Sequence, residues 1–271
     1  MIITYFSKNM ADLKIKIVPL NTDKHVIITS LNDQRMISID LQLSSEEKKV
    51  LQDLKIGIDG VMGNFLYWGS VDNEDLPSNL KSYIGTVGEN NDITADVISR
   101  LILRIAKHVT KYFDTKFAWI ETKTFLANDT FIIPRWHIDD KFFKPHTAYK
   151  LVWAIKGSQT RFGVTEDPTE FSKLTALEIQ AGHGTDENMR ARKELDQIVN
   201  EVKTQRNEAA VLYRSAGENP VVHSEPHMNK NRLFLGIVPG TKAEISEWYE
   251  RKKQKDIKKG AESRKWYYNT L

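Results

Sequence analysis

The spacing of apolar residues changes several times along the chain. Near the N-terminus, segments 14–18, 25–29 and 36–41 are rich in Ile and Val, which predicts short strands. Residues 44–54 then begin with a Ser-x-x-Glu capping box, which predicts a short helix. Residues 69–92 are polar and interrupted by Gly and Pro, so we expect a loop there.

The strongest helical pattern lies between residues 93 and 113. Apolar side chains recur there at every fourth position, and basic residues are available for the opposite face. The apolar positions are Ile93, Val97, Leu101, Ile105 and Val109. We expect this amphipathic helix to pack against a sheet.

After this helix the pattern changes to strands. The segments rich in β-branched and aromatic residues are 116–128, 130–139, 148–157, 209–215, 220–225 and 231–238. A polar helical stretch over about 167–207 interrupts them. The chain is therefore expected to be mainly β with α additions.

One elaborated domain accounts for these segments, because all-β cores with helical additions commonly reach 271 residues. We expect an N-terminal extension over 1–92, a core over 93–249 that contains the helical insertion, and a basic tail over 250–271. The formal charge is +3 overall, but the tail alone carries +5 (eight Lys or Arg and three acidic residues), which leaves about −2 elsewhere.

The basic tail has two interpretations. Its lysines and aromatic residues can contact nucleic acid or another anionic partner, although such a run is more often a solvated helix face. There is no cysteine, so disulfides and thiolate metal sites are excluded. The N-terminus lacks a signal-peptide pattern and no segment approaches a membrane span, so we expect an intracellular, cytoplasmic protein.

The candidate chemistry begins in the stretch R-W-H-I-D-D, residues 135–140. In a strand, residues i and i+2 point to the same face, so His137 and Asp139 can direct an imidazole and a carboxylate to one point. His223, near the end of a later strand, supplies a third ligand. Two imidazoles and one carboxylate form the facial triad of non-haem Fe(II) oxygenases. His227 is the rival for the third position, and it leaves only a tight turn before the next strand.

Arg232 begins that next strand, and the two strands around it can form a hairpin. Arg232 is then expected to face the interior while Leu233, Leu235 and Ile237 pack on the other side. A fixed guanidinium suits bidentate pairing with a carboxylate, and the far carboxylate of 2-oxoglutarate is the natural partner.

In this order, the residues resemble the Fe(II)- and 2-oxoglutarate-dependent dioxygenases, whose pattern is H-x-D, a distal His and an Arg about ten residues later. His137, Asp139, His223 and Arg232 carry the pattern, and the resemblance covers about residues 94–240. It implies a double-stranded β-helix core, of jelly-roll or cupin type, with supporting helices. It also implies Fe(II) as the metal and 2-oxoglutarate and O2 as co-substrates.

The resemblance further implies hydroxylation, because halogenating members typically lack the carboxylate that Asp139 provides. Tyr149 and Lys150, soon after the H-x-D, are implied as co-substrate contacts. No segment identifies the substrate. A cupin-like barrel can use the same ligands for other metal chemistry, and a non-enzymatic interaction protein can use the basic tail alone. Taken by itself, the His137 and Asp139 pair is also what an exposed strand edge carries.

Overall fold

A computed structural model describes residues 15–57, 64–128, 131–139, 149–202, 208–217, 220–258 and 265–270. Its strands are β1 (Ile17–Pro19), β2 (Met36–Asp40), β3 (Asn64–Ser70), β4 (Phe117–Phe125), β5 (Tyr149–Lys156), β6 (Arg161–Thr165), β7 (Val199–Val202), β8 (Ala209–Arg214), β9 (Val222–Ser224), β10 (Arg232–Gly240) and β11 (Lys265–Asn269). Its helices are α1 (Lys24–Gln34), α2 (Ser45–Asp53), α3 (Leu76–Thr86), α4 (Asp92–Tyr112), α5 (Pro168–Ala181), α6 (Asp186–Ile198) and α7 (Lys242–Lys258). None of these helices is long and apolar enough to cross a membrane.

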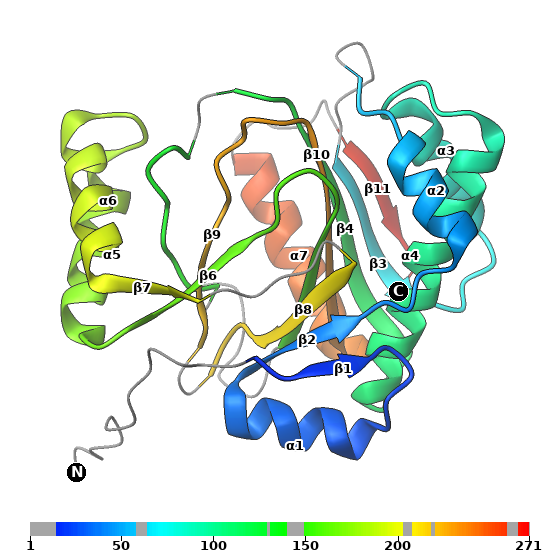
Figure 1. Cartoon of the computed structure of the whole chain (residues 1–271), viewed down its shortest axis with the longest axis horizontal. Helices are drawn as coiled ribbons and strands as arrows, with labels where there is room; N and C mark the ends of the chain where they lie inside the picture. The colour runs from blue at the N-terminus through cyan, green and yellow to red at the C-terminus, as the bar shows by residue number, and fades with distance from the viewer. Residues whose placement is uncertain are drawn as a thin grey trace.

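Two sheets form the centre of the molecule (Figure 1). The strand order of the large sheet is β1-β2-β8-β5-β10-β4-β3-β11, and that of the small sheet is β7-β6-β9. From β4 onward the chain alternates between them: β4 and β5 lie in the large sheet, β6 and β7 in the small one, and β8, β9 and β10 alternate again. This winding is a double-stranded β-helix, which confirms the predicted fold class.

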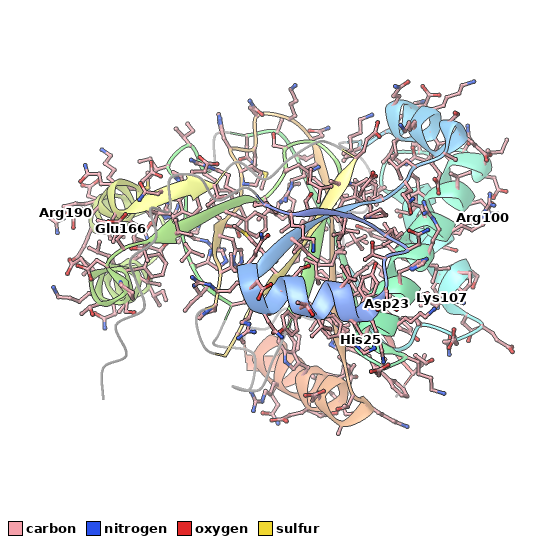
Figure 2. All side chains as sticks on the ribbon, turned by 60° about the horizontal axis from the view of Figure 1, so that its bottom comes forward. Asp23, His25, Arg100, Lys107, Glu166 and Arg190 are labelled. Atoms are coloured by element: carbon pink, nitrogen blue, oxygen red, sulfur yellow. The ribbon has the colours of Figure 1, made fainter. Side chains whose placement is uncertain are left out.

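The helix predicted over 93–113 is confirmed as α4, and it covers the outer face of the large sheet. Ile98, Ile102 and Ile105 are fully buried in the core cluster between this helix and the sheet. Arg100 and Lys107 project from its outer face (Figure 2). The 3.6-residue period of the sequence is therefore explained by one buried face.

Two predictions near the N-terminus are wrong. Residues 25–29, predicted as a strand, lie in α1, which begins where the Asp23 side chain accepts a hydrogen bond from the His25 N–H (Figure 2). That cap and burial of Ile27 and Leu31 on one face outweigh the β propensity of the segment. Residues 69–92, predicted as a loop, contain α3, whose apolar positions Leu76, Leu80, Tyr83 and Ile84 are buried.

The region around the H-x-D also differs from the prediction. The described part of 130–139 makes no strand, only an isolated antiparallel bridge between His137 and His223. Pro134 lacks an N–H and cannot donate a ladder hydrogen bond at that end. The hairpin expected between the strands of His223 and Arg232 does not form either, because β9 pairs with β6 in the small sheet whereas β10 pairs with β4 and β5.

Helices α5 and α6 form a pair at one end of the molecule, within the predicted insertion (Figure 1). They cover the small sheet through Phe171, Leu174 and Leu195, which cluster with Trp136 and Val222. Helix α7 packs instead on the large sheet, where Trp248 contacts Trp119 with ring centroids 4.9 Å apart. Side chains of both α5 and α7 line the cavity described below.

Gly157, just after β5, allows a close approach of the backbone that carries Arg232. Its φ is +92°, and a Cβ at this position would lie 2.7 Å from the Asn231 carbonyl oxygen and 2.9 Å from Arg232 Cα. We expect Gly157→Ala to lower the free energy of unfolding by about 1–3 kcal/mol, measured by urea denaturation. Gly85→Ala in α3, where a Cβ meets nothing within 4 Å, is the control and should be neutral or stabilising. Equal stability of the two variants would contradict the close approach.

Candidate metal centre and active-site cavity

His137 and His223 are neighbours across the single bridge. The backbone N–H of each donates to the carbonyl of the other at 2.9 Å, and the ring centroids are 4.4 Å apart. Asp139, two residues after His137, directs its carboxylate to the same place. One ligand atom from each of the three residues lies within 4.8 Å of the others. The structure therefore brings the three predicted ligands together.

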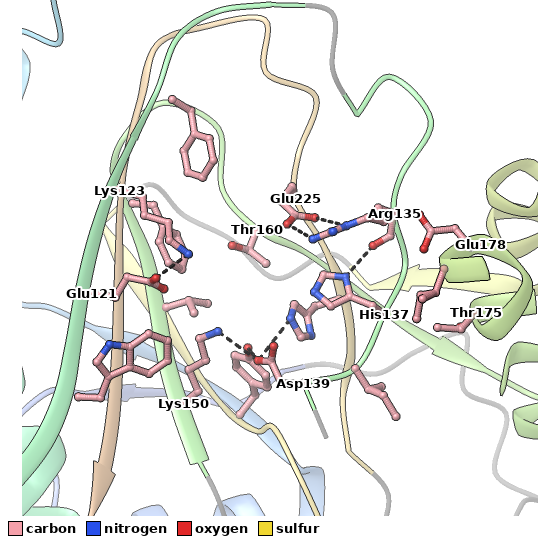
Figure 3. A pocket seen from close by; sticks show the side chains of 18 of the residues that line it. Glu121, Lys123, Arg135, His137, Asp139, Lys150, Thr160, Thr175, Glu178 and Glu225 are labelled. Carbon is pink, nitrogen blue, oxygen red and sulfur yellow. Dashed lines mark hydrogen bonds and ion pairs between the residues drawn. The ribbon is translucent and has the colours of Figure 1, made fainter. Parts of the chain in front are cut away.

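Each imidazole is oriented by a carbonyl two residues earlier. His137 Nδ1 is 2.8 Å from the Arg135 carbonyl oxygen (Figure 3). His223 Nδ1 is 3.2 Å from the Val221 carbonyl oxygen. A carbonyl only accepts, so Nδ1 carries the proton and the Nε2 lone pairs face the cluster. His223 Nε2 is 3.5 Å from Asp139 Oδ2. Lone pairs and a carboxylate at this distance repel one another unless a cation lies between them, so the donor set fits a divalent metal.

The protonation states agree with metal binding. Burial raises the pKa of Asp139, but the Lys150 ammonium and the two histidines outweigh burial and hold that pKa well below its usual value. Burial and, to a smaller extent, the neighbouring His223 lower the pKa of His137 to about 4. The site thus presents neutral His137 and ionised Asp139 at neutral pH, which is the form that ligates a metal.

Arg232 is a buried cation in the same cavity. Its side chain donates to Thr160 Oγ1 at 2.9 Å, and its guanidinium lies 4.8 Å from the centre of the Phe234 ring. Its Nε has no hydrogen-bond partner, and among the described residues it forms no ion pair with a carboxylate. Burial lowers its pKa to about 10, partly opposed by Glu225. A buried guanidinium without an anion is costly, so a carboxylate-bearing ligand fits this position.

The metal ligands and Arg232 open into one cavity of about 670 Å³ (Figure 3). Alternate residues of β4 form part of its floor, and α5 and α7 supply side chains on opposite sides. The contributing residues include Trp119, Glu121, Lys123 and Phe125 from β4, Thr175, Glu178 and Ile179 from α5, and Trp248 and Lys252 from α7. Helices α5 and α7, which lie outside the β-helix core, thus form part of the cavity wall.

Strand alternation separates the two predicted co-substrate contacts. Lys150 faces the cavity and donates to Asp139 Oδ2 at 3.1 Å. Tyr149 faces the opposite side of β5, where it stacks on Phe113 with centroids 4.9 Å apart and accepts from Arg214 at 3.2 Å. The structure therefore does not bring Tyr149 to the site.

His227, the rival third ligand, lies outside the cluster of ligand atoms found among the described residues. Its Nε2 is buried and has no hydrogen-bond partner. The geometry favours His223 as the third ligand because only its imidazole converges on Asp139.

Two polar contacts of the site were missed by sequence reasoning. Tyr213 on β8 donates its hydroxyl to Asp139 Oδ2 at 2.9 Å, and Thr160 accepts from Arg232. The alternation of β8 indicates on which face Tyr213 lies, but it does not indicate which group it meets. No spacing in the sequence links Thr160 to Arg232.

Removal of the Tyr213 hydroxyl should weaken metal binding. We expect Tyr213→Phe to lower Mn(II) affinity by about 10-fold, since groups that orient ligands typically contribute 10–100-fold. Isothermal titration of the metal-free protein measures this. Tyr83→Phe is a buried control on the core side of the large sheet and should leave the affinity unchanged. Equal affinities in wild type and Tyr213→Phe would show that the hydroxyl does not position Asp139.

No protein-family model and no curated protein sequence matches this chain. Similar solved structures include the Kdo hydroxylase KdoO, a non-haem Fe(II) and α-ketoglutarate-dependent dioxygenase (TM-score 0.44, 12% identity, covering 82% of this chain and 88% of that one). The rice dioxygenase for auxin oxidation has a TM-score of 0.41 and 9% identity and covers 83% and 82% of the two chains. A Burkholderia pseudomallei oxidoreductase of the 2OG-Fe(II) oxygenase family has a TM-score of 0.37 and 10% identity and covers 83% and 93%.

The KdoO and Burkholderia proteins are Fe(II)- and 2-oxoglutarate-dependent oxygenases. The chain is thus similar to structures of the family that its H-x-D, His and Arg pattern resembles. The chemistry of this chain depends on the residues of its own site.

Proposed function

We propose that this protein is an Fe(II)- and 2-oxoglutarate-dependent oxygenase that hydroxylates a substrate bound in the cavity. One observation carries the proposal: the cluster of His137, Asp139 and His223 shares its cavity with Arg232, a buried guanidinium that pairs with no carboxylate in the described part of the chain. Three protein ligands leave metal positions free for a keto acid and O2. Arg232 and Thr160 supply charge and a hydroxyl for the far carboxylate of 2-oxoglutarate.

Iron bound with 2-oxoglutarate and O2 supplies the oxidising chemistry that converts a C–H bond to C–OH, with succinate and CO2 as the other products. The residues of this chain bind and orient. The carbonyls of Arg135 and Val221 keep both imidazoles ready to ligate, while Tyr213 and Lys150 hold Asp139 in place. The buried setting of the centre limits access of water to it.

The test is an anaerobic titration of the metal-free protein, first with Fe(II) and then with 2-oxoglutarate. A keto acid that chelates iron gives a visible charge-transfer band, so we expect a band that saturates at one equivalent of each. Zn(II) in place of Fe(II) is the control and should give no band. A folded protein that binds Fe(II) but shows no band with 2-oxoglutarate would overturn the proposal and favour the cupin-like alternative.

Contact of residues 250–271 with nucleic acid or another anionic partner stays a prediction. In the structure this region continues α7 and adds β11 to the large sheet, and Arg251 and Lys253 are exposed on α7. If the contact exists, Arg251→Glu with Lys253→Glu should weaken binding of single-stranded RNA and reduce its salt dependence. If wild-type protein does not bind RNA in a filter-binding assay at low salt, RNA is excluded as a partner of this region.

A further inference from the structure

Charged side chains from β4 and β5 lie close together on the cavity floor, which is formed by the large sheet. Glu121 and Lys123, both on β4, form an ion pair at 2.5 Å, and Lys150 on β5 reaches across to Asp139 at 3.1 Å (Figure 3). The Lys150 side chain is 12% exposed. A buried ammonium therefore lies beside the metal centre, and it donates a hydrogen bond to one of the metal ligands.

The Lys150 side chain lies beside the neighbouring strand β10. Gly236 on β10 has no side chain, and a Cβ there would lie 3.6 Å from Lys150 Cε. This is an ordinary van der Waals distance, so the end of the lysine stem lies near the backbone of β10 at Gly236.

The charges around the cavity do not balance when the site is loaded. Its lining has five cationic side chains and four carboxylates: Lys123, Arg135, Lys150, Arg232 and Lys252 against Glu121, Asp139, Glu178 and Glu225. A divalent metal and the dianion 2-oxoglutarate add no net charge, so an excess of one positive charge remains.

The pairings distinguish Lys150, because its carboxylate partner Asp139 is itself one of the metal ligands. Glu225 pairs with Arg135, Glu178 with Arg192 and Glu121 with Lys123. In the loaded site Arg232 takes the far carboxylate of 2-oxoglutarate, and Asp139 shares its charge with the metal. Lys150 is then a desolvated cation beside a divalent ion, and the Asp139 carboxylate balances its positive charge less well than in the metal-free site.

We propose that the substrate is an organic acid whose carboxylate binds Lys150, with its apolar part along Trp119 and Val152. Both of these side chains line the same floor. The proposal rests on the proposed function, because it places the substrate beside the metal and 2-oxoglutarate. A carboxylate bound to Lys150 lies next to the metal centre, so hydroxylation is expected on a carbon close to that carboxylate.

The experiment uses full-length protein loaded with Mn(II) and saturated with 2-oxoglutarate, with acetate as the probe. Mn(II) shortens the relaxation times of nearby protons, so bound acetate shows enhanced methyl-proton relaxation. We expect a saturable enhancement in wild type and at least about 10-fold weaker acetate binding in Lys150→Met, since hydrogen bonds to charged groups contribute about 1.5–3 kcal/mol. Lys253→Met, the same charge change on the exposed face of α7, is the control and should match wild type.

The other outcomes are distinct. Equal acetate relaxation in wild type and Lys150→Met overturns the proposal. If inorganic phosphate binds more tightly than acetate and its binding also depends on Lys150, the proposal is overturned as well, because a phosphorylated substrate is then indicated. A loss of 2-oxoglutarate affinity in Lys150→Met, read from the Fe(II) charge-transfer band, also overturns it, because Lys150 then serves the co-substrate. If Lys150→Met does not fold, Lys150→Gln has a similar reach and the same expected result. A missing Fe(II) charge-transfer band in wild type contradicts the proposed function. The Mn(II) measurement does not depend on that band, so it tests the binding of the anion separately.

Discussion

Replacement of Arg232 by Met should raise the Kd for 2-oxoglutarate at least about 30-fold, because loss of one partner of a buried, hydrogen-bonded charge pair costs 2 kcal/mol or more. The free energy of unfolding of the metal-free protein should stay unchanged or rise. Met keeps the packing of the stem against Phe234 and removes a buried charge that has no counterion within the described chain. The charge-transfer titration and urea denaturation measure the two effects.

Arg161→Met is the matched control for this variant. Arg161 begins β6, pairs with Glu201 and lies outside the cavity lining, so 2-oxoglutarate affinity should not change. A variant at Arg232 that unfolds more easily yet binds 2-oxoglutarate normally would assign the guanidinium a purely structural role. It would also favour the cupin-like alternative, in which the same ligands serve different metal chemistry.

Replacement of His223 by Ala should lower Mn(II) affinity by at least about 100-fold. Loss of a group that only orients a metal ligand typically lowers metal affinity 10–100-fold, so we expect the loss of a ligand itself to lower it more. The His223 Nε2 is directed at the cluster by the hydrogen bond of its Nδ1. Among the described residues, no histidine other than His137 and His223 belongs to this cluster. Isothermal titration of the metal-free variant measures the affinity.

His227→Ala is the control for the third ligand. Its ring is close in sequence but lies outside the ligand cluster, so the variant should bind Mn(II) as wild type does. Loss of metal binding in His227→Ala, with binding retained in His223→Ala, would reverse the assignment.

Elements with strong local signals were predicted correctly. The capping box of α2 is present as both hydrogen bonds between Ser44 and Glu47, and α4 follows its apolar stripe. The errors arose where two local signals compete. In α1 the cap at Asp23 opposes β-branched residues, and in α3 a polar composition conceals four buried apolar positions. Local propensity is weak compared with tertiary burial, which decided both cases.

The sequence by itself determined the order His137, Asp139, His223 and Arg232, because the types and spacing of these residues are local properties of their segments. Only the tertiary structure decided which groups surround them. Tyr213 meets Asp139 across 74 residues, and Lys150 rather than Tyr149 enters the cavity because the pairing of β5 in the large sheet determines which face is inside. The physical reason is that strand alternation specifies two faces, whereas the packing of the two sheets selects the one that lines the site.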